Sequence, residues 1–165
     1  MDNNRQQNGQ SRPRTDFSHS GGSNRGFDAS RENADSKFSE LTFQPNWITE
    51  GADSSLVEYA EKAGKFMAKN NLTNSKIRSI YGEIKRIQMG EFEKEKSSFY
   101  LLKPKVAYAL GRDDKNEGLK LFKKVFDKAS DYVKNQKSYE NFCNFIEAVL
   151  AYHKAYGGKD WLMLN

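Results

Sequence analysis

The chain has 165 residues, a net charge of +5 and a hydrophobic fraction of 36%, which allows one ordinary domain. A single cysteine, Cys143, excludes an intramolecular disulfide and cannot build a metal site alone. Apolar runs are shorter than the roughly eighteen residues of a membrane span, and no charged-then-apolar signal segment opens the sequence. We therefore expect a cytoplasmic protein without a membrane partner.

Residues 1–40 hold few apolar side chains, namely Met1, Phe17, Phe27, Ala29, Ala34 and Phe38. They offer too little apolar surface to offset the entropy lost on ordering a backbone. We predict a disordered arm rich in Arg, Asn, Ser and Gly here. Residues 41–52 are predicted as an extended strap that docks aromatic side chains on a helical bundle domain over 53–165. That domain holds 21 Lys and Arg against 15 Asp and Glu, which suits a polyanionic partner or ordinary solubility.

Apolar residues recur at steps of three and four through the domain, and this spacing predicts helices. Five helices are expected. The first begins after Asp53 and the second after Thr73. The third covers about 98–110, the fourth about 116–135, and the fifth runs from after Ser138 to Gly157. The charged stretch 91–96 is expected to lie between the second and third helices. Pro104 marks either a kink or the first turn of a helix that starts later. Residues 161–165 are apolar and are expected to pack back on the bundle. No segment alternates with period two, so the predicted fold class is all-α, a compact five-helix bundle.

Catalytic residue types are scarce. His19 lies in the arm, and His153 lies on the fifth helix, where a packed, hydrogen-bonded structural role is favoured. Cys143 sits in an apolar stripe and is predicted to be a buried thiol. Ten residues of helix, about 15 Å of rise, separate Cys143 from His153, so the imidazole cannot activate the thiol. Neither a metal-ligand spacing nor a glycine-rich phosphate loop is present. We predict no enzyme, no metal and no cofactor.

Basic residues form two candidate RNA contacts. On the second helix, Asn74, Arg78, Gly82 and Lys85 follow one side without an acid. The bare Gly82 between two cations would let an RNA backbone approach closely, although a plain solvated helix face is the alternative.

On the third helix, Lys105, Tyr108 and Arg112 share a face, with Lys103 nearby. An aromatic ring between two cations can stack on a base while the cations hold phosphates. Tyr108 fits a place in the core equally well.

Three stretches in order resemble a known family: 75–81 (SKIRSIY, then Glu83-Ile84), 102–112 (LKPKVAYALGR) and 145–159 (FIEAVLAYHKAYGGK). They resemble the small subunit of the Csm effector complex of type III-A CRISPR systems, over about residues 53–159. The resemblance implies a compact five-helix bundle without catalytic residues, in a ribonucleoprotein that serves antiviral defence. It also implies head-to-tail stacking on copies of itself, opposite the ridge of backbone subunits, with those ridge subunits and the large polymerase-cyclase subunit as partners.

The resemblance further implies contacts with target RNA and guide RNA through basic residues. By position these are Lys76, Arg78, Lys103, Lys105, Arg112, Lys154 and Lys159, and the second-helix strip adds Lys85. Guide–target pairing carries the sequence information in guided recognition, so such contacts should be indifferent to sequence. Residues 1–40 depart from the family pattern. Two rival readings are a helical protein–protein adapter without RNA contact and the analogous small subunit of another CRISPR effector class.

Overall fold

The computed structural model describes residues 42–157, and the regular structure within them is entirely helical, which confirms the all-α class. The helices are α2 (Asn46–Thr49), α3 (Ser54–Lys69), α4 (Asn74–Gln88), α5 (Phe92–Tyr100), α6 (Leu102–Gly111), α7 (Glu117–Ser130) and α8 (Gln136–Ala155). No helix in this part of the chain is long and apolar enough to cross a membrane. The expectations for residues 1–40 and 161–165 fall outside the described residues.

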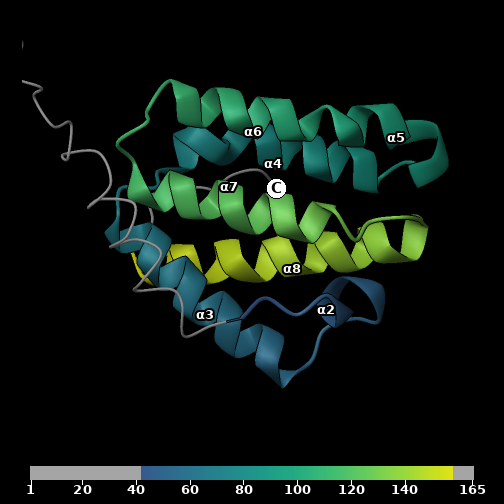
Figure 1. Ribbon diagram of the computed structural model, residues 1–165, viewed down its shortest axis with the longest axis horizontal. Coiled ribbons are helices and arrows are strands. Elements are labelled where there is room, and N and C mark those ends of the chain that lie inside the picture. The colour runs from purple at the N-terminus through teal and green to yellow at the C-terminus, as the bar shows by residue number, and fades with distance from the viewer. Residues whose placement is uncertain (1–41, 158–165) are drawn as a thin grey trace, which may run out of the picture.

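Helix α8 is the centre of the bundle, because it packs against α2, α3, α4, α5 and α7. Figure 1 shows α5 and α6 end to end along one edge, next to α4, with α7 and α8 in the middle and α2 and α3 at the other edge. Helix α3 crosses α8 closely at Gly64, where a β-carbon would lie 2.6 Å from both the His153 nitrogen and the Val149 oxygen. Only glycine fits this crossing without a shift of the α8 backbone.

Local sequence signals explain where most helices begin. The Asp53 carboxylate accepts a hydrogen bond from the Leu56 nitrogen at 2.9 Å and caps α3. The Asn116 side chain caps α7 in the same way, through the Leu119 nitrogen at 2.8 Å. The apolar stripe of α4 is buried as its spacing predicts, with Ile77, Ile80, Ile84 and Ile87 all in the core.

The segment 91–111 differs from the expectation of a charged connection followed by one helix. Helix α5 already begins at Phe92, inside the charged stretch, and a junction at Leu101 separates it from α6. The charges support this helix, because Lys94 pairs with Glu91 and Lys96 with Glu93 at i,i+3 spacing. Phe92 and Phe99 anchor its inner side in the core. Pro104 is the third residue of α6, which agrees with a place in the first turn.

The fourth and fifth predicted helices meet at a different point from the one expected. Helix α7 ends at Ser130 instead of about 135, and α8 begins at Gln136 instead of after Ser138. Asn135 is the reason, because its side chain and that of Ser138 form a reciprocal capping box that starts α8.

The predicted strap docks its aromatic residues but is not wholly extended. Pro45 has a φ of −58° and starts the helical turn α2, so the prediction of an extended strap was wrong for residues 46–49. Trp47 is buried against Phe145, with ring centroids 5.9 Å apart, and the Asn141 amide donates a hydrogen bond to the Ile48 oxygen at 3.0 Å. The strap is therefore an integral part of the core.

Candidate nucleic-acid interface

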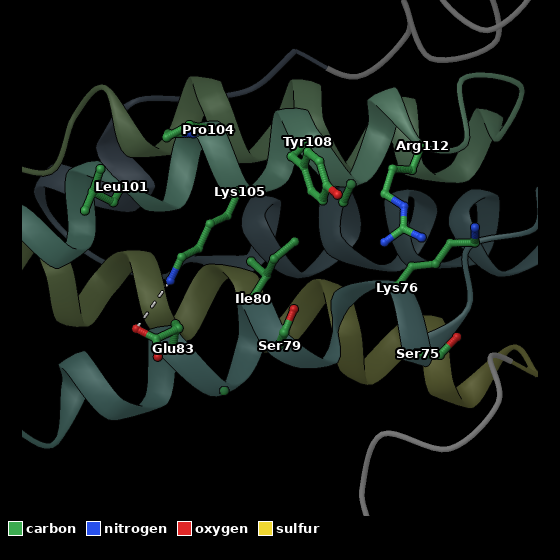
Figure 2. A pocket seen from close by; sticks show the side chains of 12 residues that line it. Ser75, Lys76, Ser79, Ile80, Glu83, Leu101, Pro104, Lys105, Tyr108 and Arg112 are labelled. Carbon is green, nitrogen blue, oxygen red and sulfur yellow. Dashed lines mark ion pairs between the residues drawn. The ribbon is translucent and has the colours of Figure 1, made fainter.

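A groove of about 1090 Å³ lies between α4 and α6 (Figure 2). It is lined by Ser75, Lys76, Ser79, Ile80, Gly82 and Glu83 from α4 and by Leu101, Pro104, Lys105, Tyr108, Ala109 and Arg112 from the α6 segment. We call it the α4/α6 groove. Its charged lining consists of three cations and one carboxylate, so the groove itself is basic.

The α6 wall supplies an aromatic ring between two cations. Lys105, Tyr108 and Arg112 project from α6 toward α4 (Figure 2), because residues at i, i+3 and i+7 share one face of a helix. Tyr108 is 68% exposed, which decides against the core alternative for its ring. The Arg112 guanidinium carbon lies 5.8 Å from the centre of that ring, within the range of a cation–π contact.

The α4 wall contributes a helix N-terminus and a third cation. The first turn of α4 has no acidic residue, so no side chain within that turn offsets the partial positive charge of the helix end. Lys76 forms an ion pair with Asp113, and hydrogen bonds from Lys76 and then Asn116 lower the pKa of Asp113. Further along the groove, the Lys105 nitrogen lies 3.8 Å from a Glu83 oxygen. Both pairs are partly exposed, and such pairs stabilise a protein by about 1 kcal/mol or less.

The predicted strip of Asn74, Arg78, Gly82 and Lys85 is not one exposed surface. Asn74 is only 3% exposed, because it lies at the edge of the buried side of α4. The Lys85 nitrogen is 2.9 Å from a Glu147 oxygen of α8, so an acid from another helix faces the strip. Gly82 lines the groove, whereas Arg78 does not. Arg78 follows Lys76 by two residues, about 200° around the helix, so these two side chains leave α4 in nearly opposite directions.

The remaining predicted cations lie away from the groove lining. Lys103 forms an ion pair with Asp131 at the end of α7 instead of joining Lys105. Lys103 precedes Lys105 by two residues on α6, so the two side chains point about 200° apart around the helix. Lys154 is partly buried near the end of α8, and Lys159 lies outside the described residues. The structure thus brings together Lys76, Lys105 and Arg112 and separates the others from them.

The candidate catalytic residues have structural roles. His153 is buried, and its Nε2 atom lies 2.7 Å from the Leu72 oxygen in a hydrogen bond. Burial lowers the pKa of His153, although this hydrogen bond acts in the opposite direction. Burial raises the pKa of Cys143 to about 11. A buried thiol with a raised pKa is a poor nucleophile. Within residues 42–157, no cluster of three His, Cys, Asp or Glu has the arrangement to hold a metal.

Sequence reasoning missed the acids that pair with the groove's cations and the hydroxyls that line the groove. Asp113 and Glu83 engage two of its cations, and only the packing of α6 beside α4 brings them together. Ser75 and Ser79 line the α4 wall, and their i,i+4 spacing on the side of Lys76 was a signal for this placement.

Comparisons with known proteins agree with the motifs. The Csm2 Type III-A family model matches residues 50–159 of this chain. A Streptococcus thermophilus protein named "CRISPR system Cms protein Csm2" is 31% identical over 120 residues, which cover 66% of this chain and 96% of the relative. No solved structure matches. The chain therefore belongs to the Csm2 family of type III-A CRISPR systems, the small-subunit family that its three motifs resemble.

Proposed function

We propose that this chain is a non-catalytic small subunit that contacts target RNA and guide RNA within a cytoplasmic type III-A effector complex. The observation that supports RNA contact best is the α4/α6 groove, where Lys76, Lys105 and Arg112 surround the exposed Tyr108. Cations along a groove bind the phosphate backbone, and backbone contacts position RNA without reading its sequence. This suits guided recognition, in which pairing between guide and target carries the sequence information.

Arg112 is the strongest single candidate for a phosphate contact. It has no acidic partner among the described residues, and its neighbour is the neutral ring of Tyr108. A guanidinium presents planar paired donors that match phosphate oxygens. Arg78 is also exposed without an acidic partner in the described part of the chain, and we assign it a separate contact on the other side of α4. Lys85, Lys103, Lys154 and Lys159 complete the proposed set as peripheral contacts.

Membership of the Csm2 family supports assembly with other Csm subunits. We propose head-to-tail stacking between copies along the complex, opposite the ridge of backbone subunits, with those subunits and the large polymerase-cyclase subunit as partners, in antiviral defence. Head-to-tail stacking uses different surfaces on the two partners, so it can extend along an elongated complex.

The test is salt-dependent binding of the purified full-length chain to a fluorescent single-stranded RNA of arbitrary sequence. Lys105→Ala with Arg112→Ala should weaken binding several-fold. The loss of two phosphate contacts should flatten the salt slope by about 1.4, since each contact on a single strand contributes about 0.7. The matched control is Lys62→Ala with Lys137→Ala, which removes the same charge from exposed positions outside the groove. Equal slopes for the two variants would refute the groove as the RNA contact.

Exposed apolar side chains support a second candidate function, the helical adapter that binds protein and no RNA. Met89 is 90% exposed and Leu101 is 58% exposed, so both side chains are accessible to a protein partner that would cover them. If the chain is such an adapter, it should not bind RNA even at low salt. Co-expressed Csm subunits should still capture it as well as before. The small subunit of another effector class would instead purify with that class's subunits.

A further inference from the structure

Tyr108 is the tyrosine in the lining of the α4/α6 groove. It is 68% exposed, and its ring projects into the groove from α6 (Figure 2). Apart from Arg112, the described residues give the Tyr108 ring no aromatic or cationic partner. A large flat apolar surface at the wall of a basic groove is suited to a ligand that is itself flat and attached to an anion.

The groove separates apolar from ionic surface in a way that fits such a ligand. Beside Tyr108 the lining includes Ile80 and Ala109, which are apolar, and the cations Lys105 and Arg112 flank the ring along α6. On the opposite wall, Ser75 and Ser79 offer hydroxyls that can donate to or accept from a sugar or phosphate. The volume of about 1090 Å³ is at the upper end of small-molecule sites, so one or two nucleotides fit within it.

The ion pairs in the groove can exchange partners at little cost. Glu83 accepts hydrogen bonds from Arg86 at 3.3 Å as well as pairing with Lys105 at 3.8 Å. If Lys105 turns to a phosphate, the Glu83 carboxylate keeps its contact with Arg86 and is not left without a counter-charge. The longer and looser of the two contacts is the one that a ligand would replace.

We infer that the α4/α6 groove binds an unpaired RNA nucleotide, with its base stacked on Tyr108 and its phosphates held by Lys105 and Arg112. This inference rests on the proposed RNA contact and specifies its ligand. A base inside a continuous duplex stacks on its neighbours and presents only its edges, so its face cannot reach a tyrosine ring. Stacking on an aromatic side chain is available to every base, so the site tolerates any sequence.

The experiment compares one RNA in two forms, single-stranded and annealed to its complement, with the full-length chain at low salt. Tyr108→Ala should weaken binding of the single strand about ten-fold, within the range that stacking contributes per base. It should change duplex binding less than two-fold, and Tyr108→Phe should bind both forms like the unmodified chain. The exposed ring is not part of the core, so Tyr108→Ala should melt at the unmodified temperature.

A second readout follows the base itself. A single strand that carries 2-aminopurine should lose fluorescence on binding to the unmodified chain and keep it with Tyr108→Ala, because stacking quenches this base. Equal effects of Tyr108→Ala on the two RNA forms, or unchanged quenching, would overturn the inference and leave the groove as a backbone contact. If Lys105→Ala with Arg112→Ala has no effect on either form, the proposed function fails first and the inference fails with it.

Discussion

The close crossing of α3 and α8 at Gly64 provides a test of the fold that can be worked from the structure. A β-carbon at Gly64 would meet the His153 nitrogen and Val149 oxygen at 2.6 Å and the Tyr152 β-carbon at 2.7 Å. Two of these neighbours are backbone atoms of α8, which cannot move without disturbing the rest of the bundle. Overpacking of this kind costs about 1–3 kcal/mol or more, against the roughly 1 kcal/mol that alanine gains over glycine in a helix.

An overpacking cost of about 3 kcal/mol, less the roughly 1 kcal/mol gained in helix propensity, leaves a net loss. We therefore expect Gly64→Ala to lower the free energy of unfolding by about 2 kcal/mol. Gly82→Ala is the matched control, because Gly82 also lies inside a helix but has nothing within 4 Å of its β-carbon position. That variant should gain up to about 1 kcal/mol from helix propensity alone. Urea unfolding followed by circular dichroism measures both changes. A Gly64→Ala protein as stable as Gly82→Ala would refute the α3–α8 crossing.

Four further predictions concern the core and the arm. Trp47→Ala should destabilise the bundle by about 3–5 kcal/mol in the same unfolding assay, because Trp47 is fully buried and donates to Asp53 and Ser55 at 3.0 Å; a change below 1 kcal/mol would contradict the docked strap. Burial lowers the pKa of His153, so as the pH falls the unfolded chain takes up a proton at this residue before the folded chain does. The free energy of unfolding should therefore keep its full value above about pH 6.5. Below that pH, down to the lowered pKa, it should fall by at most about 1.4 kcal/mol per pH unit. His153→Gln should remove that part of the pH dependence, and an identical profile would contradict it. Cys143 should resist thiol reagents at pH 8 until the protein unfolds, because burial raises its pKa to about 11, and rapid labelling of the folded protein would disprove this. Deletion of residues 1–40 should leave the melting temperature unchanged, whereas a clear drop would show that the arm contributes to the fold.

The sequence was sufficient for the fold class and for the cores of α3, α4 and α8, because their apolar residues recur with a clean helical period. The prediction from the sequence was wrong at α5. The charged residues of this segment were interpreted as a loop between helices, whereas their i,i+3 ion pairs support a helix. The prediction was also wrong at the boundary before α8, where the capping box of Asn135 and Ser138 decides the first residue. In each case a local side-chain interaction outweighed the apolar pattern.

The candidate site was predictable on α6 and only partly on α4. Lys105, Tyr108 and Arg112 share a face whatever the tertiary structure, so the period alone placed them together. On α4 the period does not tell which side meets the rest of the bundle: Asn74 is buried, and Lys85 pairs with Glu147 of α8. The pairings of Glu83 with Lys105 and of Asp113 with Lys76 join α4 to the α6 segment, and no single-helix projection contains them.

The most direct test of the RNA contact is ultraviolet crosslinking of the full-length chain to a single-stranded RNA, with crosslinked residues identified by mass spectrometry. Our account predicts that nucleotide adducts concentrate on the α6 segment 102–112, with Tyr108 among the modified residues and adducts reduced in Lys105→Ala with Arg112→Ala. Adducts confined to residues 1–41 or to α3, with none on α4 or α6, would contradict it.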